Sequence, residues 1–298
     1  MIRFRKISYS EVTYSVALHV ELLLSRPLRA DKQRYNAVVA QIEVFLTNLE
    51  RETSRVVQLI EDAKRRSLFS APTKATPWTV KDQITHLAYF DEMAELTLTD
   101  PDAFDDKIRL DENSATSICE SVRLRYSELS NAETQEWFFR SRSSLLSTLS
   151  TGQLPRRVSW FGPAMSPISL LVSRTMESWA HGFDIAETTG LQVAESTSLK
   201  DVCDIGYRTF ANSFITNGLE VPESEVFVIL TLPWGEVLRF GHPESLDKVE
   251  GPAKDFALVV TQRKSFERTS LVIQGDVAHE WMAVAQCFAG PPGDRRRS

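Results

Sequence analysis

The chain has 298 residues, a length typical of one or two domains that are each large enough to bury a core. It contains 34 Lys and Arg against 40 Asp and Glu, which gives a formal net charge of −6. This mildly acidic balance lacks the basic field that attracts phosphates, so it argues against nucleic acid as the main partner and favours a small molecule.

The first 35 residues predict an extension that precedes the first domain. They contain seven Lys and Arg against three acids, a balance that faintly resembles an organelle presequence, but the acids and the missing small-residue cleavage site favour a poorly ordered or packed extension. The most apolar run, 16–24, is interrupted by His19 and Glu21 and is too short to span a bilayer. We therefore expect neither a membrane span nor a membrane partner.

Apolar residues at helical spacing predict four helical segments, over residues 36–64, 79–98, 114–150 (as one long or two shorter helices) and 167–189. Thr79, three residues before Asp82, predicts a capping box at the start of the second segment. Pro167 and Gly190 mark the start and the end of the fourth. An antiparallel four-helix bundle is the simplest packing of four such helices, and we assign it residues 36–195.

The pattern changes after residue 196. It predicts one helix over 199–215, four strands over 225–232, 236–240, 256–262 and 270–274, and a final helix over 276–288. We expect residues 196–290 to form a small α+β domain with a mainly antiparallel sheet, and residues 291–298 to form a flexible tail. The fold class is therefore α+β, with two domains.

The cysteine pattern favours a reducing compartment. Cys119, Cys203 and Cys287 are odd in number, far apart and without a CxxC motif. We expect reduced thiols, no disulfide, no cysteine metal site and a cytoplasmic protein.

The helix over 167–189 contains a polar stripe on an otherwise apolar surface. Arg174, Glu177, His181 and Asp184 follow one another at steps of three, four and three residues. A buried stripe of ionisable groups is costly unless the groups pair or hold an ion. Glu177 and His181 can direct a carboxylate oxygen and an imidazole nitrogen at one point, as ligand pairs do in helix bundles.

The third ligand is expected from the helix over 79–98, where His86 flanks the apolar arc. His86, Glu177 and His181 would leave one coordination position open, which distinguishes catalytic zinc from structural zinc. Ferrous iron, nickel or manganese would also suit this set of ligands. The alternative is that the histidines are ordinary packing residues of a helical core.

Four further residues are candidates for the site. We expect Arg174 and Asp184 to act beside the metal, by balancing charge or by orienting His181. Trp78 and Trp160 are expected to line the pocket that binds the cofactor.

Two motifs resemble those of a known family. They are Trp78-Thr-Val-Lys-Asp-Gln followed by His86-Leu-Ala-Tyr-Phe-Asp-Glu, and Arg174-Thr-Met-Glu-Ser-Trp-Ala-His-Gly-Phe-Asp-Ile-Ala. Over about residues 40–195 the chain resembles the mycothiol-dependent maleylpyruvate isomerase family, a branch of the DinB-like metal-binding bundles. The resemblance implies that the family's metal triad falls on His86, Glu177 and His181. The segments that begin at Val249 and Gly275 are similar to the sterol-carrier-type α+β domain often appended to this bundle.

The resemblance implies an enzyme in which a divalent metal, with zinc expected, activates a low-molecular-weight thiol. The thiol would be mycothiol or glutathione, and the reaction isomerisation or S-transfer on a small unsaturated substrate. Two other functions stay open: a metal-dependent hydrolase or lyase that activates water, and a non-catalytic protein that binds a small molecule. The sequence leaves the oligomeric state open between a monomer and a homodimer.

Overall fold

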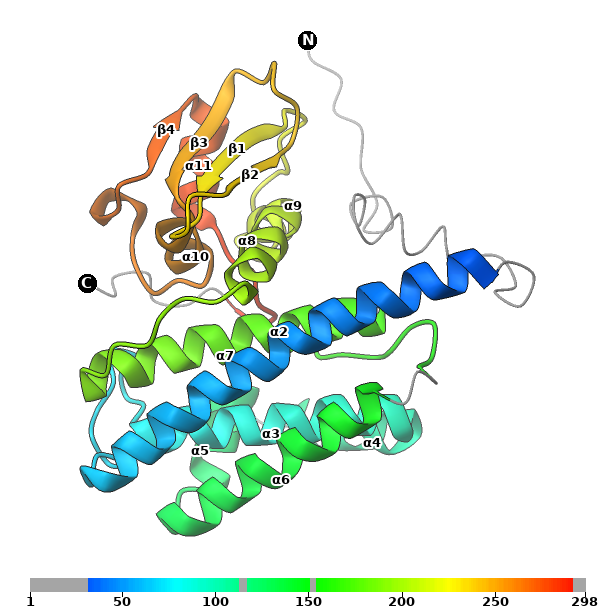
Figure 1. The fold of residues 1–298 in the computed structure, drawn as a ribbon, viewed down its shortest axis with the longest axis vertical. Helices are drawn as coiled ribbons and strands as arrows, with labels where there is room; N and C mark the ends of the chain where they lie inside the picture. The colour runs from blue at the N-terminus through cyan, green and yellow to red at the C-terminus, as the bar shows by residue number, and fades with distance from the viewer. Residues whose placement is uncertain (1–31, 113–116, 151–153, 292–298) are drawn as a thin grey trace.

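The computed structural model describes residues 32–112, 117–150 and 154–291, in which helices come first and a sheet follows (Figure 1). Apart from the short 3-10 helix 266–268, the elements discussed below are α2 (Lys32–Arg65), α3 (Val80–Thr99), α4 (Pro101–Glu112), α5 (Ile118–Arg125), α6 (Asn131–Ser150), α7 (Pro167–Thr189), α8 (Ser198–Arg208), α9 (Phe210–Thr216), β1 (Val226–Thr231), β2 (Val237–Phe240), β3 (Asp247–Pro252), α10 (Ala253–Val260), β4 (Val272–Gln274) and α11 (Asp276–Val284).

The four long helices of the first half are α2, α3, α6 and α7, which lie side by side as a bundle (Figure 1). Helix α2 packs on α7, and α3 packs on both α6 and α7. The predicted four-helix bundle is therefore confirmed, and the segment 114–150 takes the two-helix alternative as α5 and α6. Helix α2 begins at Lys32, so the last four residues of the predicted extension are helical. The rest of the extension and the tail 292–298 lie outside the described residues.

The start of α3 and both ends of α7 lie where the sequence predicts them, and capping residues explain why. At α3, the Thr79 hydroxyl accepts from the Asp82 amide, and the Asp82 carboxylate accepts from the Thr79 amide at 2.8 Å. At α7, Ser166 caps the start before Pro167, and Gly190 ends the helix with a φ of 71° that favours glycine.

The second half forms a four-stranded sheet in the order β2-β1-β3-β4. The pairs β1–β2 and β3–β4 are antiparallel, whereas β1 and β3 are parallel. The expected α+β domain with a mainly antiparallel sheet is confirmed, and helices α10 and α11 pack against the sheet. Its boundary near residue 195 and its sterol-carrier type stay predictions.

Three predicted elements of this half are wrong. The predicted strand over 256–262 is not formed, because residues 256–260 belong to helix α10 and residues 261–262 to the turn that follows it. The third strand is instead β3, which was not predicted. The predicted helix over 199–215 is divided at Thr209 into α8 and α9. The last helix ends at Val284, four residues earlier than predicted. In the first half, helix α4 was missed: it is short, and its sequence is mostly polar.

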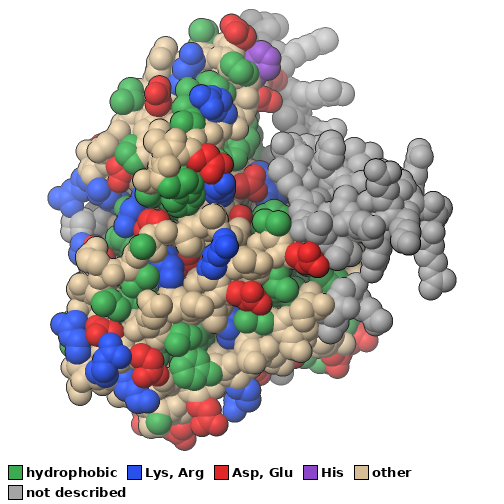
Figure 2. All heavy atoms as spheres, in the orientation of Figure 1, with side chains coloured by type: hydrophobic (Ala, Val, Ile, Leu, Met, Phe, Trp, Pro, Cys, Tyr) green, Lys and Arg blue, Asp and Glu red, His purple; other side chains and the backbone are tan. Residues whose placement is uncertain are grey.

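Figure 2 shows how charged side chains are distributed on one face of the molecule. On the face drawn in Figure 2, acidic and basic side chains of the described residues are interspersed and form no large field of one sign. Among the described helices, none is long and apolar enough to cross a membrane.

Candidate metal site

The three predicted ligands meet between α3 and α7. His86 comes from α3, while Glu177 and His181 lie one turn apart on α7. Glu177 Oε2 lies 3.3 Å from His86 Nε2 and 3.0 Å from His181 Nε2. One ligand atom of each residue lies within 4.8 Å of the other two. The structure thus brings together two imidazoles and a carboxylate, although His86 and His181 are 95 residues apart in the sequence.

The two contacts of Glu177 are close to the ligand spacing around a divalent cation. Ligands at about 2.0–2.2 Å from a tetrahedral metal lie roughly 3.3–3.6 Å from one another. The two contacts of Glu177 are at or just below this range. The residues also suit the ion chemically, since two imidazole nitrogens and one carboxylate oxygen are ligands that zinc and related metals accept. Three protein ligands leave at least one position for another group.

Burial keeps the two histidines in the neutral state that binds metal. His86 is 8% exposed and His181 is 7% exposed. Burial lowers the pKa of His86, and burial together with the nearby His86 lowers the pKa of His181 to about 4. Burial alone would raise the pKa of Glu177, but its contacts with His181 and His86 outweigh this effect and hold that pKa well below the ordinary value. The site therefore presents a carboxylate and two neutral imidazoles near pH 7.

The outer nitrogen of His181 contacts Gln83, which lies one turn before His86 on α3. His181 Nδ1 and Gln83 Oε1 form a short hydrogen bond. Gln83 Nε2 in turn donates to Thr73 Oγ1 at 3.0 Å. The sequence suggested that Asp184 could orient His181. In the structure, the side chain that orients His181 is Gln83 instead. His86 Nδ1 is buried and has no hydrogen-bond partner among the described residues.

Arg174 belongs to a buried ion cluster beside the triad. Its Nε donates to Asp91 Oδ1 at 3.1 Å, and Arg142 donates to the same carboxylate at 2.7 Å. Because two guanidinium groups share one carboxylate, the cluster keeps one positive charge in excess. Arg174 Nη2 is buried without a hydrogen-bond partner among the described residues, and its guanidinium lies 6.0 Å from the Phe90 ring, which contacts His86. Arg174 is therefore placed to balance negative charge near the triad.

Asp184 connects the two domains. Its carboxylate accepts from Arg263 at 2.9 Å, and both side chains are less than one-tenth exposed. Arg263 follows α10 in the second domain, and its charge contributes to lowering the pKa of both histidines. The second domain thus brings a cation close to the metal ligands of the first.

The charge of Glu177 also affects the pKa of two free thiols. Burial, together with the charge of Glu177, raises the pKa of Cys119 to about 12 and raises that of Cys287 as well. Both thiols therefore stay protonated near neutral pH.

Aromatic rings surround the histidines. The Trp78 ring stacks on His181 with centroids 5.9 Å apart and lies 5.3 Å from His86. Trp160 is more distant, since its ring stacks on Phe104 and reaches His86 only through Phe90. Trp78 therefore lies at the site, as expected, whereas Trp160 is separated from it by Phe90. A contact between either tryptophan and a cofactor stays a prediction.

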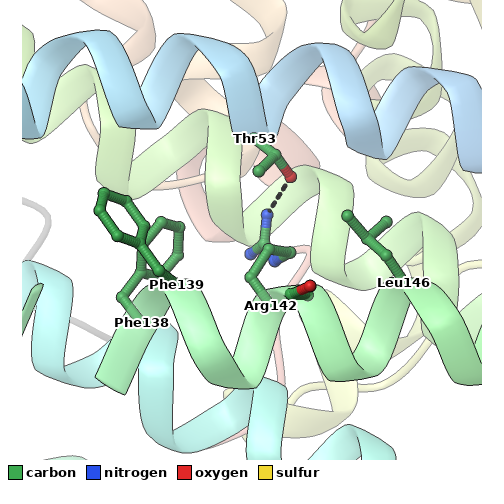
Figure 3. Close-up of a pocket in the computed structure, with 6 residues that line it drawn as sticks. Thr53, Phe138, Phe139, Arg142 and Leu146 are labelled. Carbon is green, nitrogen blue, oxygen red and sulfur yellow. Dashed lines mark hydrogen bonds between the residues drawn. The ribbon is translucent and has the colours of Figure 1, made fainter. Parts of the chain in front are cut away.

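A pocket of about 150 Å³ lies elsewhere, between α2 and α6 (Figure 3). Figure 3 shows Phe138, Phe139 and Leu146 around it and Arg142 at its centre, which donates to Thr53 Oγ1 at 2.7 Å. No residue of the triad lines this pocket. One of its lining residues, Arg142, belongs to the Arg142–Asp91–Arg174 cluster.

Four residues that shape the site were missed in the sequence, namely Gln83, Asp91, Arg142 and Arg263. Gln83 had a signal, because it precedes His86 by three residues and therefore shares its helix face. The other three had none in the local pattern, since an isolated charge does not reveal its distant partner.

Comparisons with known proteins show which family the chain resembles. The family model of the mycothiol maleylpyruvate isomerase N-terminal domain matches residues 47–186, which include all three predicted ligands. The uncharacterized protein Rv0036c of Mycobacterium tuberculosis (strain ATCC 25618 / H37Rv) is 32% identical over 252 residues, which cover 85% of this chain and 98% of that protein. The uncharacterized protein MT0041 of strain CDC 1551 / Oshkosh matches to the same extent.

Among solved structures, the crystal structure of the mycothiol-dependent maleylpyruvate isomerase is 16% identical and covers 75% of this chain and 90% of that one, with a TM-score of 0.49. Over residues 47–186, the chain therefore belongs to the family of mycothiol maleylpyruvate isomerase N-terminal domains.

Proposed function

We propose that this protein is a metal-dependent enzyme that uses a low-molecular-weight thiol, mycothiol or glutathione, for isomerisation or S-transfer on a small unsaturated substrate. The observation that carries the proposal is the convergence of His86, Glu177 and His181 within the segment that matches the family model. The proposed metal is zinc, since two nitrogens and one oxygen with an open position are typical of catalytic zinc. A cytoplasmic location stays a prediction.

The chemistry of such a site follows from its ligands. A divalent cation held by the triad would supply Lewis acidity that deprotonates a bound thiol, or lowers the pKa of bound water to about 7 on zinc. Addition of the thiol to an activated double bond, rotation and elimination would give cis–trans isomerisation, and addition alone would give an S-conjugate. Arg174 and Arg263 would balance the negative charge of a substrate or cofactor, since each retains a buried nitrogen without a partner among the described residues.

Metal analysis tests the proposal. We expect the purified protein to bind about one equivalent of divalent metal, and His86→Ala and His181→Ala to lose most of it, because each substitution removes a ligand. His279→Ala is the control, since His279 is an exposed histidine of α11. Near-stoichiometric metal in both triad variants would exclude the site.

The nature of the activated group needs a separate experiment. Mycothiol and glutathione are titrated into the cobalt-substituted protein, and sulfur coordination is expected to change the visible spectrum for one of them. An unchanged spectrum with both thiols would favour a hydrolase or lyase that activates water.

The packing of the second domain supports an enzyme over a simple binding protein. Trp281 is completely buried there, and the rings of Tyr207, Phe210 and Phe256 lie within 6.3 Å of it. Side chains therefore fill the interior of this domain around Trp281 and leave no space for a ligand at this point.

A further inference from the structure

We infer that Gln83 is a positioning residue that fixes the tautomer and the ring orientation of His181 through a relay from Thr73. The inference rests on the proposed metal-dependent function and adds a specific role for a neutral amide outside the set of ligands. It comes from the hydrogen-bond directions around three side chains.

The relay begins at Thr73. Its hydroxyl donates to the carbonyl oxygen of Trp78 at 2.9 Å, so the hydroxyl oxygen is left to accept. It accepts from Gln83 Nε2 at 3.0 Å, and it also lies 3.3 Å from the amide nitrogen of Ala75. Because the amide nitrogen of Gln83 is engaged by Thr73, the amide oxygen must be the atom that faces His181.

The orientation of the amide determines the state of the imidazole. Gln83 Oε1 can only accept, so His181 Nδ1 must carry the hydrogen of their contact. The lone pair of the neutral ring is then on Nε2, which is the nitrogen that faces Glu177 and the candidate metal position. The relay therefore selects the tautomer that can bind a metal before any metal arrives.

The environment of Gln83 supports a fixed role. Its side chain is completely buried, Thr73 is 5% exposed, and Trp78 stacks on the His181 ring from one side. His86 offers a contrast, because its Nδ1 is buried without a partner among the described residues. The two histidines of the triad are thus held differently: within the part of the chain that the structure describes, Nδ1 of His181 has a hydrogen-bond acceptor and Nδ1 of His86 has none.

Two substitutions at Gln83 distinguish positioning from packing. Gln83→Leu removes the acceptor, and we expect the Kd for Zn²⁺ to rise by about 10- to 100-fold, as is common when the outer partner of a metal-binding histidine is lost. Gln83→Glu keeps an acceptor and makes the imidazole more basic, so zinc is expected to bind at least as tightly as in the wild type. A purely structural role would weaken binding in both variants, since both lose the donor to Thr73.

The control is Gln135→Leu, which replaces another buried glutamine of the bundle whose partner is Glu61. It should leave the Kd for Zn²⁺ unchanged. A spectroscopic readout complements it: in the zinc-loaded, ¹⁵N-histidine-labelled protein, we expect a slowly exchanging proton on His181 Nδ1 that exchanges faster in Gln83→Leu.

The outcomes separate this inference from the proposed function. Equal zinc affinity in the wild type and Gln83→Leu, or equal weakening in Gln83→Leu and Gln83→Glu, would overturn the role of Gln83 while leaving the metal site intact. A wild type that binds no divalent metal would instead overturn the proposed function.

Discussion

Asp91 shows how one residue determines the charge balance beside the site. It is completely buried on α3, and it accepts hydrogen bonds from Arg142 at 2.7 and 3.2 Å and from Arg174 at 3.1 Å. Arg142 also donates to Ser178 at 2.9 Å, so the cluster connects α3, α6 and α7. A charge buried at this depth is tolerated only because its partners are buried with it.

Removal of this carboxylate should be costly. Asp91→Asn leaves two buried guanidinium groups without a counter-charge, and we expect the free energy of unfolding to fall by about 3–5 kcal/mol, measured by urea denaturation. Asp62→Asn is the control, because Asp62 pairs with the half-exposed Arg65 and Arg66 and its loss should cost less than about 1 kcal/mol. If both variants lose the same free energy of unfolding, the buried cluster contributes no more to stability than the exposed ion pairs of Asp62.

At the scale of elements, the predictions succeeded where periodicity and caps agreed. The helices that hold the triad have both an apolar pattern and capping residues, so their ends and the convergence of His86 with Glu177 and His181 could be predicted. For α10 the two signals conflicted. Val259 and Val260 favour a strand by their branched side chains, yet the helix forms because tertiary packing of its apolar face outweighs this preference.

The packing of α10 gives a second prediction. Gly206 of α8 lies against α10, and a Cβ placed on it would be 2.7 Å from Val260 Cγ2 and 3.0 Å from Phe256 Cε1. Val260 cannot easily move away, since valine is stiff about χ1. We expect Gly206→Ala to lower the free energy of unfolding, because overpacking of about 1–3 kcal/mol exceeds the gain of up to about 1 kcal/mol in helix propensity.

Gly182 of α7 is the matched control for this substitution. A Cβ there would lie 3.5 Å from Val56 and 3.6 Å from Leu59, which is ordinary contact. Gly182→Ala should therefore stabilise the protein through helix propensity alone. If thermal denaturation shows the same sign for both variants, the close approach of α8 and α10 is not what requires glycine at 206.

At the scale of the whole molecule, polar contacts join the two domains, as two examples show. One is the Asp184–Arg263 pair near the site. The other lies between α2 and the start of α8, where Asn48 donates to Asp201 at 2.9 Å and Ser198 donates to Glu52. Such long-range pairs could not be predicted, because nothing local in the sequence connects residues about 150 positions apart.

The contact between α2 and α8 should depend on pH. Burial raises the pKa of Asp201 to about 7, with the neighbouring Asp204 and Glu52 adding to this effect and Asn48 and Arg208 opposing it. The unfolded chain releases this proton at its ordinary value of 3.8, so between about pH 4 and pH 7 the folded protein binds more protons than the unfolded one. Stability from this group is therefore greatest at low pH and is lost as the pH rises to about 7.

Asp201→Asn tests this dependence, because asparagine has no charge to bury and can still accept from Asn48. We expect the variant to gain stability relative to the wild type, and the gain to be larger at pH 8 than at pH 5, measured by denaturant unfolding at both values. Burial also raises the pKa of Glu52, so the variant retains part of the slope. Asp106→Asn, at an exposed acid that pairs with Arg109, controls for the loss of one negative charge. A difference between Asp201→Asn and the wild type that stays constant from pH 5 to pH 8 would mean that Asp201 is ionised in the folded protein throughout this range.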